Sequence, residues 1–183
     1  DQALQDRVLD ELVAILLEKG YQGLDVDFEF VFPQDAGAYA DFLGRLSARF
    51  NPMGYPVIAA LAPKTSSNQK GLLYEGHNYR AIGEAVDRAF LMTYEWGYTY
   101  GPPMAVAPLP NVRQVVEYAL RAGAVAVVLA HNHPSGVALP SQEDCATTRL
   151  IRDALRTMNI QLVDHIIVAD GDYVSMAASG LLI

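Results

Sequence analysis

Cysteine is nearly absent from this 183-residue sequence, which contains only Cys145. A single thiol cannot close an internal disulfide, and it has no second thiol with which to build a sulfur-rich metal site. We therefore expect Cys145 to be a small buried residue on a helix.

Long apolar runs are also missing. No stretch approaches the roughly 20 residues that a helix needs to cross a bilayer, and residues 1–6 lack the basic start and apolar block of a signal peptide. The sequence predicts no membrane partner and a cytoplasmic location.

Positive charge is in short supply. Thirteen Lys and Arg residues stand against 21 Asp and Glu residues, so the formal net charge is -8. Such a field repels a phosphate backbone, and no block of basic residues interleaved with aromatics supplies a local exception. Direct nucleic-acid binding is therefore disfavoured.

What remains is an ordinary globular composition, with 51% hydrophobic and 19% charged residues. The length falls within the range of one domain. Apolar periodicity alternates between helical and strand spacing, which favours a layered α/β or α+β fold. Helices are predicted over 4–16, 39–50, 82–90, 112–120 and 146–158, and strands over 24–32, 55–62, 104–107, 124–130, 160–168 and from 173.

The strand predicted at 124–130 (AVAVVLA) is a continuous apolar run with three β-branched valines, as in a central strand buried on both faces. His131 and His133 follow it two residues apart, so the pleat points both imidazoles to one face. Asp144 falls in the first turn of the next helix, where the helix dipole keeps it ionised. Two imidazoles and one carboxylate suit a tetrahedral zinc ion with a fourth position left for water. Such an ion activates that water and polarises a carbonyl, so the sequence predicts a catalytic zinc site.

The spacing of this segment also resembles a known pattern. The JAMM (MPN-plus) motif is matched by His-x-His, followed after seven residues by Ser141 and after two more by Asp144. The amino acids at 131–136 and 140–144 resemble those of the RadC family. Residues 163–168, 170–175 and 180–182 are similar to the RadC C-terminal segment, so the resemblance runs from about Met104 to Ile183.

This resemblance implies a JAB/MPN-like domain in which a mixed β-sheet is flanked by helices. It implies that His131, His133 and Asp144 bind zinc, and that Ser141 lies beside the metal-bound water and stabilises the oxyanion. The chain is then expected to be one domain, 1–183, with a divergent half at 1–103 and a RadC-like half at 104–183. The implied activity is hydrolysis of peptide or isopeptide bonds, with a protein or peptide as substrate.

The sequence departs from that pattern in one respect. JAMM enzymes need a glutamate as general base at the start of an earlier strand, and residues 51–56 contain no carboxylate there. Glu29, Glu75, Glu84 and Glu95 are the upstream candidates, although each also fits an ordinary surface carboxylate.

Several alternatives stay open. Ser141 and Asp144 also fit a capping box at a helix start, and His165 is either a residue that orients a metal ligand or a hydrogen-bonded core histidine. His77 is predicted to be a loop residue. The first functional hypothesis is a zinc-dependent peptidase or isopeptidase. The second is a metal-binding interaction module without efficient hydrolysis, and the third, a DNA-repair association, rests on the RadC family name alone.

Overall fold

The computed structural model describes residues 1–94, 96 and 100–182, which form two compact units, Asp1–Gly123 and Ala124–Ile183. These are here called unit 1 and unit 2, and the single domain expected over 1–183 stays a prediction. Both combine helices with a small sheet, which confirms the predicted mixed α/β class. None of the described helices is long and apolar enough to span a membrane.

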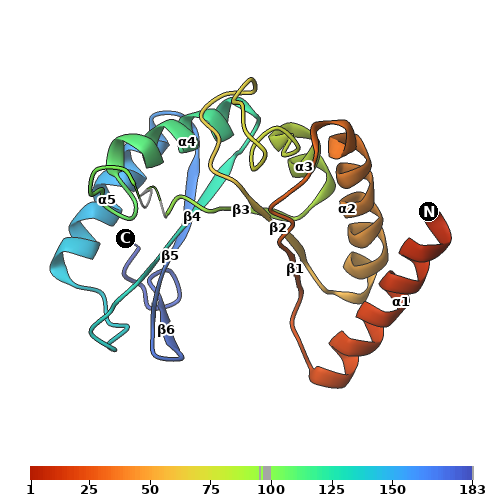
Figure 1. Ribbon diagram of the computed structural model, residues 1–183. Helices are drawn as coiled ribbons and strands as arrows, with labels where there is room; N and C mark the ends of the chain where they lie inside the picture. The colour runs from red at the N-terminus through yellow and green to blue at the C-terminus, as the bar shows by residue number, and fades with distance from the viewer. Residues whose placement is uncertain (95, 97–99, 183) are drawn as a thin grey trace. The chain divides into compact units, whose positions relative to one another are not determined.

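Unit 1 is built from strand–helix–strand repeats (Figure 1). Its three strands lie in the order β1-β2-β3, and both pairings are parallel. Parallel neighbours need a crossover connection, which α2 and α3 supply. The elements are α1 (Gln2–Lys19), β1 (Leu24–Val26), α2 (Ala36–Phe50), β2 (Val57–Leu61), α3 (Tyr79–Ala85), β3 (Arg88–Leu91) and α4 (Leu109–Arg121), with short 3-10 turns at Pro33–Asp35 and Asn51–Met53.

The core of unit 1 lies between this sheet and its helices. The predicted apolar stripe of α2 is buried, with Leu43 and Phe50 fully enclosed, and the central strand β2 contributes Val57 and Leu61. Helix α1 ends at Gly20, which adopts a left-handed conformation and returns its N–H to the carbonyl of Leu16. The sequence predicted these features because each is set by local periodicity or a terminator.

Three predictions in unit 1 are wrong. The strand expected over 24–32 ends at Val26, and residues 27–32 form no strand. The helix expected over 82–90 ends at Ala85, and Ala89 and Phe90 belong to β3. The chain becomes extended at Val86, and the carboxylate of Asp87 accepts a hydrogen bond from the β2 backbone, so strand pairing outweighs the helical period. The strand expected over 104–107 is irregular chain.

Unit 2 has the strand order β4-β5-β6, with β4 parallel to β5 and β5 antiparallel to β6. Its elements are β4 (Ala126–Asn132), α5 (Gln142–Arg156), β5 (Gln161–Ala169) and β6 (Asp172–Ser175). Asp170 and Gly171 both have positive φ at the β5–β6 turn, which the sequence predicted.

The prediction that β4 is a central strand buried on both faces is wrong. Strand β4 pairs only with β5 among the described strands, and Val125 and Val128 beside and within it are 76% and 45% exposed. A β-branched run records strand propensity, and it does not by itself report how many neighbours the strand has.

Candidate functional site

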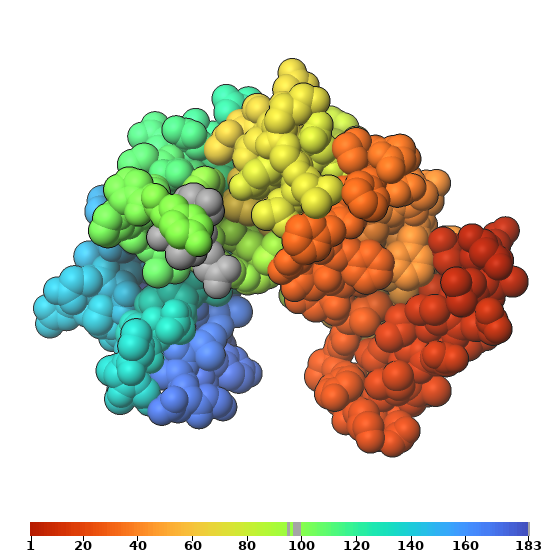
Figure 2. Space-filling view, in the orientation of Figure 1, coloured from red at the N-terminus to blue at the C-terminus, as the bar shows by residue number. Residues whose placement is uncertain are grey.

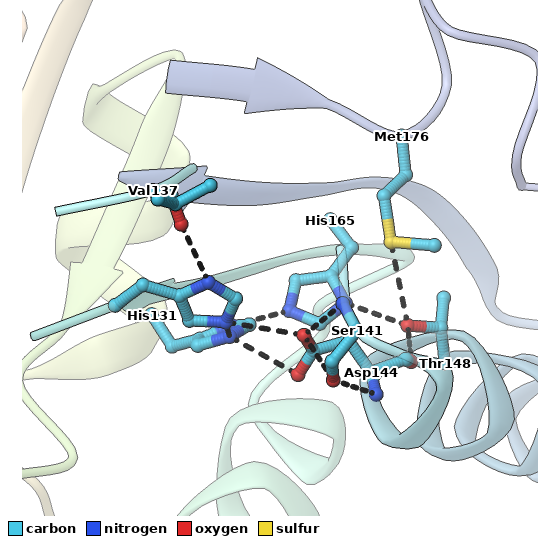
Figure 3. Close-up of polar contacts among 8 residues, drawn as sticks. His131, Val137, Ser141, Asp144, Thr148, His165 and Met176 are labelled. Carbon is cyan, nitrogen blue, oxygen red and sulfur yellow. Dashed lines mark hydrogen bonds and ion pairs between the residues drawn. The ribbon is translucent and has the colours of Figure 1, made fainter. Parts of the chain in front are cut away.

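Unit 2 brings together the three residues that the sequence selected as metal ligands. His131 lies near the end of β4, His133 follows it, and Asp144 lies in the first turn of α5. The Nε2 atoms of the two histidines are 3.0 Å apart, and the Asp144 carboxylate lies 3.2 Å from His131 Nε2 and 3.1 Å from His133 Nε2 (Figure 3). Among the described residues, these three form the one cluster of potential metal ligands. The predicted convergence of their side chains is thus present.

Hydrogen bonds at the far side of each ring fix the tautomers in this cluster. His133 Nδ1 faces the carbonyl oxygen of Val137 at 2.9 Å, so it must carry the proton and leave Nε2 with a lone pair. Thr148 donates to the carbonyl of Asp144 and therefore accepts from His165 Nδ1 at 2.6 Å. His165 Nε2 in turn accepts from His131 Nδ1 at 2.8 Å, which leaves a lone pair on His131 Nε2. Two nitrogen lone pairs and a carboxylate thus face one another.

Three electron-pair donors that converge in this way have the composition of a divalent-cation site. His165 is buried and holds His131, so it combines the two roles left open for it, a core histidine and an orienting residue. Burial lowers the pKa of His165, which favours its neutral form. Metal ligation by His131, His133 and Asp144 stays a prediction.

Ser141 and Asp144 form the capping box that competed with a catalytic role for the serine. Ser141 Oγ accepts from the Asp144 N–H at 3.0 Å, and the Asp144 carboxylate accepts from the Ser141 N–H at 2.8 Å. Desolvation opposes ionisation of Asp144, but these bonds and the nearby imidazoles outweigh it and hold its pKa below the ordinary range. Ser141 therefore has a structural task at the start of α5, and a catalytic role for it stays a prediction.

Unit 1 carries a second polar cluster, at the carboxyl end of β1. Asp25, Asp27 and Glu29 alternate along the chain with residues that face α2. Val26 is buried, and the ring of Phe28 stacks on Tyr39 of α2 with centroids 5.7 Å apart. Asp25, within β1, and Asp27 and Glu29, in the segment just beyond it, are by contrast exposed.

The charges of this cluster interact. Desolvation and then the neighbouring Asp27 raise the pKa of Asp25, while the backbone N–H of Val26 lowers it. Burial, Asp27 and Asp25 together raise the pKa of the Tyr39 phenol to about 12. Like charges close to one another at the end of a parallel strand mark a functional-site candidate.

The other upstream glutamates have ordinary settings. Glu75 forms an ion pair of 2.9 Å with Lys70, and its pKa is lowered by that hydrogen bond. Glu84 lies exposed on α3, and Glu95 lies outside the described residues. Of the candidates that the structure describes, Glu29 is the one beside other carboxylates at a strand end.

Comparison with known proteins gives the family of this chain. The model of glycosyl hydrolases family 18 matches residues 1–133, well over half of the chain. This chain belongs to glycosyl hydrolase family 18. It is 48% identical over 120 residues to the cortical fragment-lytic enzyme of Bacillus subtilis, covering 66% of this chain and 28% of that protein. The chain thus spans less than a third of that family 18 relative's length.

Solved structures agree with the family 18 assignment. The spore cortex-lytic enzyme SleL of Bacillus cereus superposes with a TM-score of 0.66 at 38% identity, covering 72% of this chain and 30% of that one. SleL of Bacillus megaterium gives a TM-score of 0.65 at 33% identity, covering 88% and 38%. A class V chitinase from Pseudomonas fluorescens gives 0.65 at 26% identity, covering 81% and 49%.

The RadC resemblance is confirmed for the C-terminal part. The model of the RadC-like JAB domain matches residues 107–181. A UPF0758 protein of Photobacterium profundum is 53% identical over 70 residues, covering 38% of this chain and 31% of that protein. Residues 107–133 are matched by both family models.

The predicted function, however, is wrong. The family 18 match over residues 1–133 and the cortex-lytic relatives indicate a glycosidase family in place of a zinc peptidase. Family 18 enzymes hydrolyse with assistance from the substrate itself, so the expected zinc cofactor is overturned as well. The alternatives of an impaired metal-binding module and a DNA-repair factor are set aside with it. The pattern Asp25-x-Asp27-x-Glu29 was interpreted from the sequence as part of a half-buried strand.

Proposed function

We propose that unit 1 supplies the acid carboxylates of an enzyme that hydrolyses glycosidic bonds in an N-acetylated polysaccharide of the chitin or spore-cortex type. The observation that carries this proposal is the row of Asp25, Asp27 and Glu29 at the carboxyl end of a parallel strand. In parallel α/β sheets, ligands bind beyond the carboxyl ends of the strands. The names of the relatives supply the substrate class.

Within this proposal each carboxylate has a different task. Glu29 lies farthest along the chain from β1 and is exposed, so it is the group that can reach a leaving-group oxygen as general acid. Asp27 is one pleat repeat closer to the strand, about 7 Å along an extended chain. There its negative charge stabilises the positive charge that develops on the sugar ring and its assisting acetamido group. Asp25, with its raised pKa, is the innermost member of the row.

Replacing the proposed acid tests this assignment. Glu29→Gln preserves size and hydrogen bonding but removes the transferable proton, so kcat should fall by about 10²–10⁴-fold. The assay follows release of reducing ends from cortex fragments and from chitin oligosaccharides. Glu84→Gln, an exposed carboxylate on α3, is the matched control and should retain wild-type activity. Equal activity of the two variants would refute the assignment.

The cytoplasmic location and the absence of nucleic-acid and membrane partners stay predictions from the sequence.

A further inference from the structure

His77 is a fully buried histidine in the loop between β2 and α3. Its ring stacks beside Tyr39, with centroids 6.0 Å apart. Both ring nitrogens contact backbone groups of neighbouring strands. The N–H of Ala62, just beyond β2, donates to Nδ1 at 3.0 Å, and Nε2 lies 2.9 Å from the carbonyl oxygen of Phe28, just beyond β1.

The strand register shows what this ring replaces. Leu24 pairs with Val57 and donates its N–H to the carbonyl of Pro56 at 2.9 Å, as a parallel ladder requires. Continued four residues along both strands, the same register would pair the carbonyl of Phe28 with the N–H of Ala62. These are the two groups that bind opposite edges of the imidazole. His77 is therefore inserted into the β1–β2 ladder in place of its last hydrogen bond.

The insertion fixes one tautomer of His77. A backbone N–H can only donate and a carbonyl can only accept, so Nδ1 holds the lone pair and Nε2 holds the proton. Burial lowers the pKa of His77, with Lys64 acting in the same direction and the Phe28 carbonyl and Asp27 opposing it. The neutral ring thus accepts a hydrogen bond from the β2 side and donates one to the β1 side.

The loop that carries His77 also packs closely against the chain beyond Glu29. A Cβ atom on Gly76 would lie 2.0 Å from the carbonyl oxygen of Val31, so only glycine permits this approach. The buried ammonium of Lys64 donates to the carbonyl of His77 at 2.9 Å and anchors the loop from the other side. Figure 2 shows this loop (yellow) against the segment that follows β1 (orange).

We infer that His77 is a positioning residue for the carboxylate row: its inserted imidazole separates β1 from β2 and, with Gly76, holds residues 28–31 so that Glu29 is presented at a fixed place. This inference rests on the proposed function, because it assigns His77 a task in the reaction of Glu29. Glu29 lies between the two gripped positions, Phe28 and Val31, so the strand end cannot close onto β2 or swing away.

Two substitutions of His77 by amide side chains test the inference, because each amide can replace the hydrogen bond of one ring nitrogen. His77→Gln can keep a donor for the Phe28 carbonyl, whereas His77→Asn keeps an acceptor for Ala62 but does not reach Phe28. Misplacing a catalytic group by about 1 Å costs about 100-fold in rate. We therefore expect His77→Asn to lower kcat by about 100-fold while KM changes by less than about threefold, and His77→Gln to restore most of kcat.

Tyr79→Phe provides the control for a general loss of packing. The Tyr79 hydroxyl donates to the Ala62 carbonyl at 2.6 Å and accepts from the Lys64 N–H at 2.9 Å, equally buried but without contact to Phe28. This variant should lose stability and retain kcat within about threefold. If His77→Asn and Tyr79→Phe lose activity equally, His77 is only structural and the inference is wrong.

A second readout needs no turnover. Nitrogen-15 NMR of the full chain should show His77 as the neutral Nε2–H tautomer at pH 7.5. An Nδ1–H tautomer or a protonated ring would overturn the inserted-ring geometry. If the wild-type protein hydrolyses glycans and Glu29→Gln does not, but His77→Asn stays active, this inference fails and the proposed function survives. If the wild-type protein is inactive, both fail.

Discussion

The two units organise their polar clusters in opposite ways. In unit 2 the donors meet: His131, His133 and Asp144 lie within about 3 Å of one another, tied by a chain of hydrogen bonds that reaches Thr148. In unit 1 the carboxylates of Asp25, Asp27 and Glu29 follow one another along the chain. Contacts to the backbone between them, such as that of His77 with the Phe28 carbonyl, set their positions. A cluster of converging ligands can be recognised in a sequence from residue types and their spacing. A row of alternating carboxylates has the same sequence pattern as an ordinary amphipathic strand. The sequence therefore drew attention to unit 2, whereas the proposed glycosidase chemistry rests on the carboxylates of unit 1.

The difference between the two clusters is tested most directly by making the same substitution in each of them. Asp27→Asn removes the charge that would stabilise the developing cation and should lower kcat/KM for glycan hydrolysis by about 100-fold. Asp144→Asn makes the same chemical change in unit 2 and should leave glycan hydrolysis within about twofold of wild type. A large loss from the unit 2 substitution would show that its cluster takes part in the reaction.

Asp27→Asn also gives a readout on ionisation. Because Asp27 raises the pKa of Asp25, removing its charge should move the Asp25 pKa down toward the ordinary range. Carbon-13 NMR of the carboxyl groups measures this directly. An unchanged Asp25 titration would mean that the two carboxylates do not sense one another.

Gly76 tests the grip on the segment beyond Glu29 through stability. Gly76→Ala drives a methyl group into the Val31 backbone and should lower the free energy of unfolding by about 1–3 kcal/mol. Gly83→Ala is the matched control, because a Cβ at that position on α3 meets nothing within 4 Å. It should stabilise by about 0.5–1 kcal/mol, since alanine favours helix. Urea unfolding of both variants distinguishes the two, and similar midpoints would contradict the close approach.

The buried imidazole of His77 predicts a pH dependence of stability. Its folded-state pKa lies below that of the unfolded chain, about 6.5. As the pH falls below that value, His77 becomes protonated in the unfolded state but stays neutral in the folded state. The contribution of His77 to the free energy of unfolding is therefore complete above that pH and declines on acidification. The urea midpoint of unit 1 should therefore drop between pH 7.5 and 5.5, and by less in His77→Gln. A midpoint that rises on acidification would reverse the sign.

Ser141 has the smallest expected effect. Ser141→Ala removes the hydroxyl that caps α5 and should destabilise unit 2 by about 1 kcal/mol, whereas Ser141→Thr keeps the cap. Thermal unfolding followed by circular dichroism measures the difference. Equal melting temperatures for the two variants would show that the cap contributes little.

Local features of the fold could be predicted from the sequence and long-range ones could not. The end of α1 at Gly20, the apolar stripe of α2 and the Asp170-Gly171 turn follow from rules that act within a few residues. The division after Gly123 and the edge position of β4 depend on which strands find partners, and no local pattern encodes that.

The candidate sites divide in the same way. The convergence of His131, His133 and Asp144 was predictable because a strand end and the next helix start bring them together. His77 was expected to be an ordinary loop residue, and its place between Phe28 and Ala62 could not be predicted. Those contacts join positions 49 and 15 residues away along the chain. Its sequence context carries one clue, the glycine beside it.

The exposed edge of β4 has a practical consequence for dissecting this protein. Among the described strands β4 pairs with β5 alone, so its other side offers amides and carbonyls to an extended chain, and the exposed Val125 and Val128 add apolar surface nearby. Unit 2 prepared alone would be prone to stack through this edge as its concentration rises, so ligand titrations on it belong at high dilution or after a lysine has been placed at Val128.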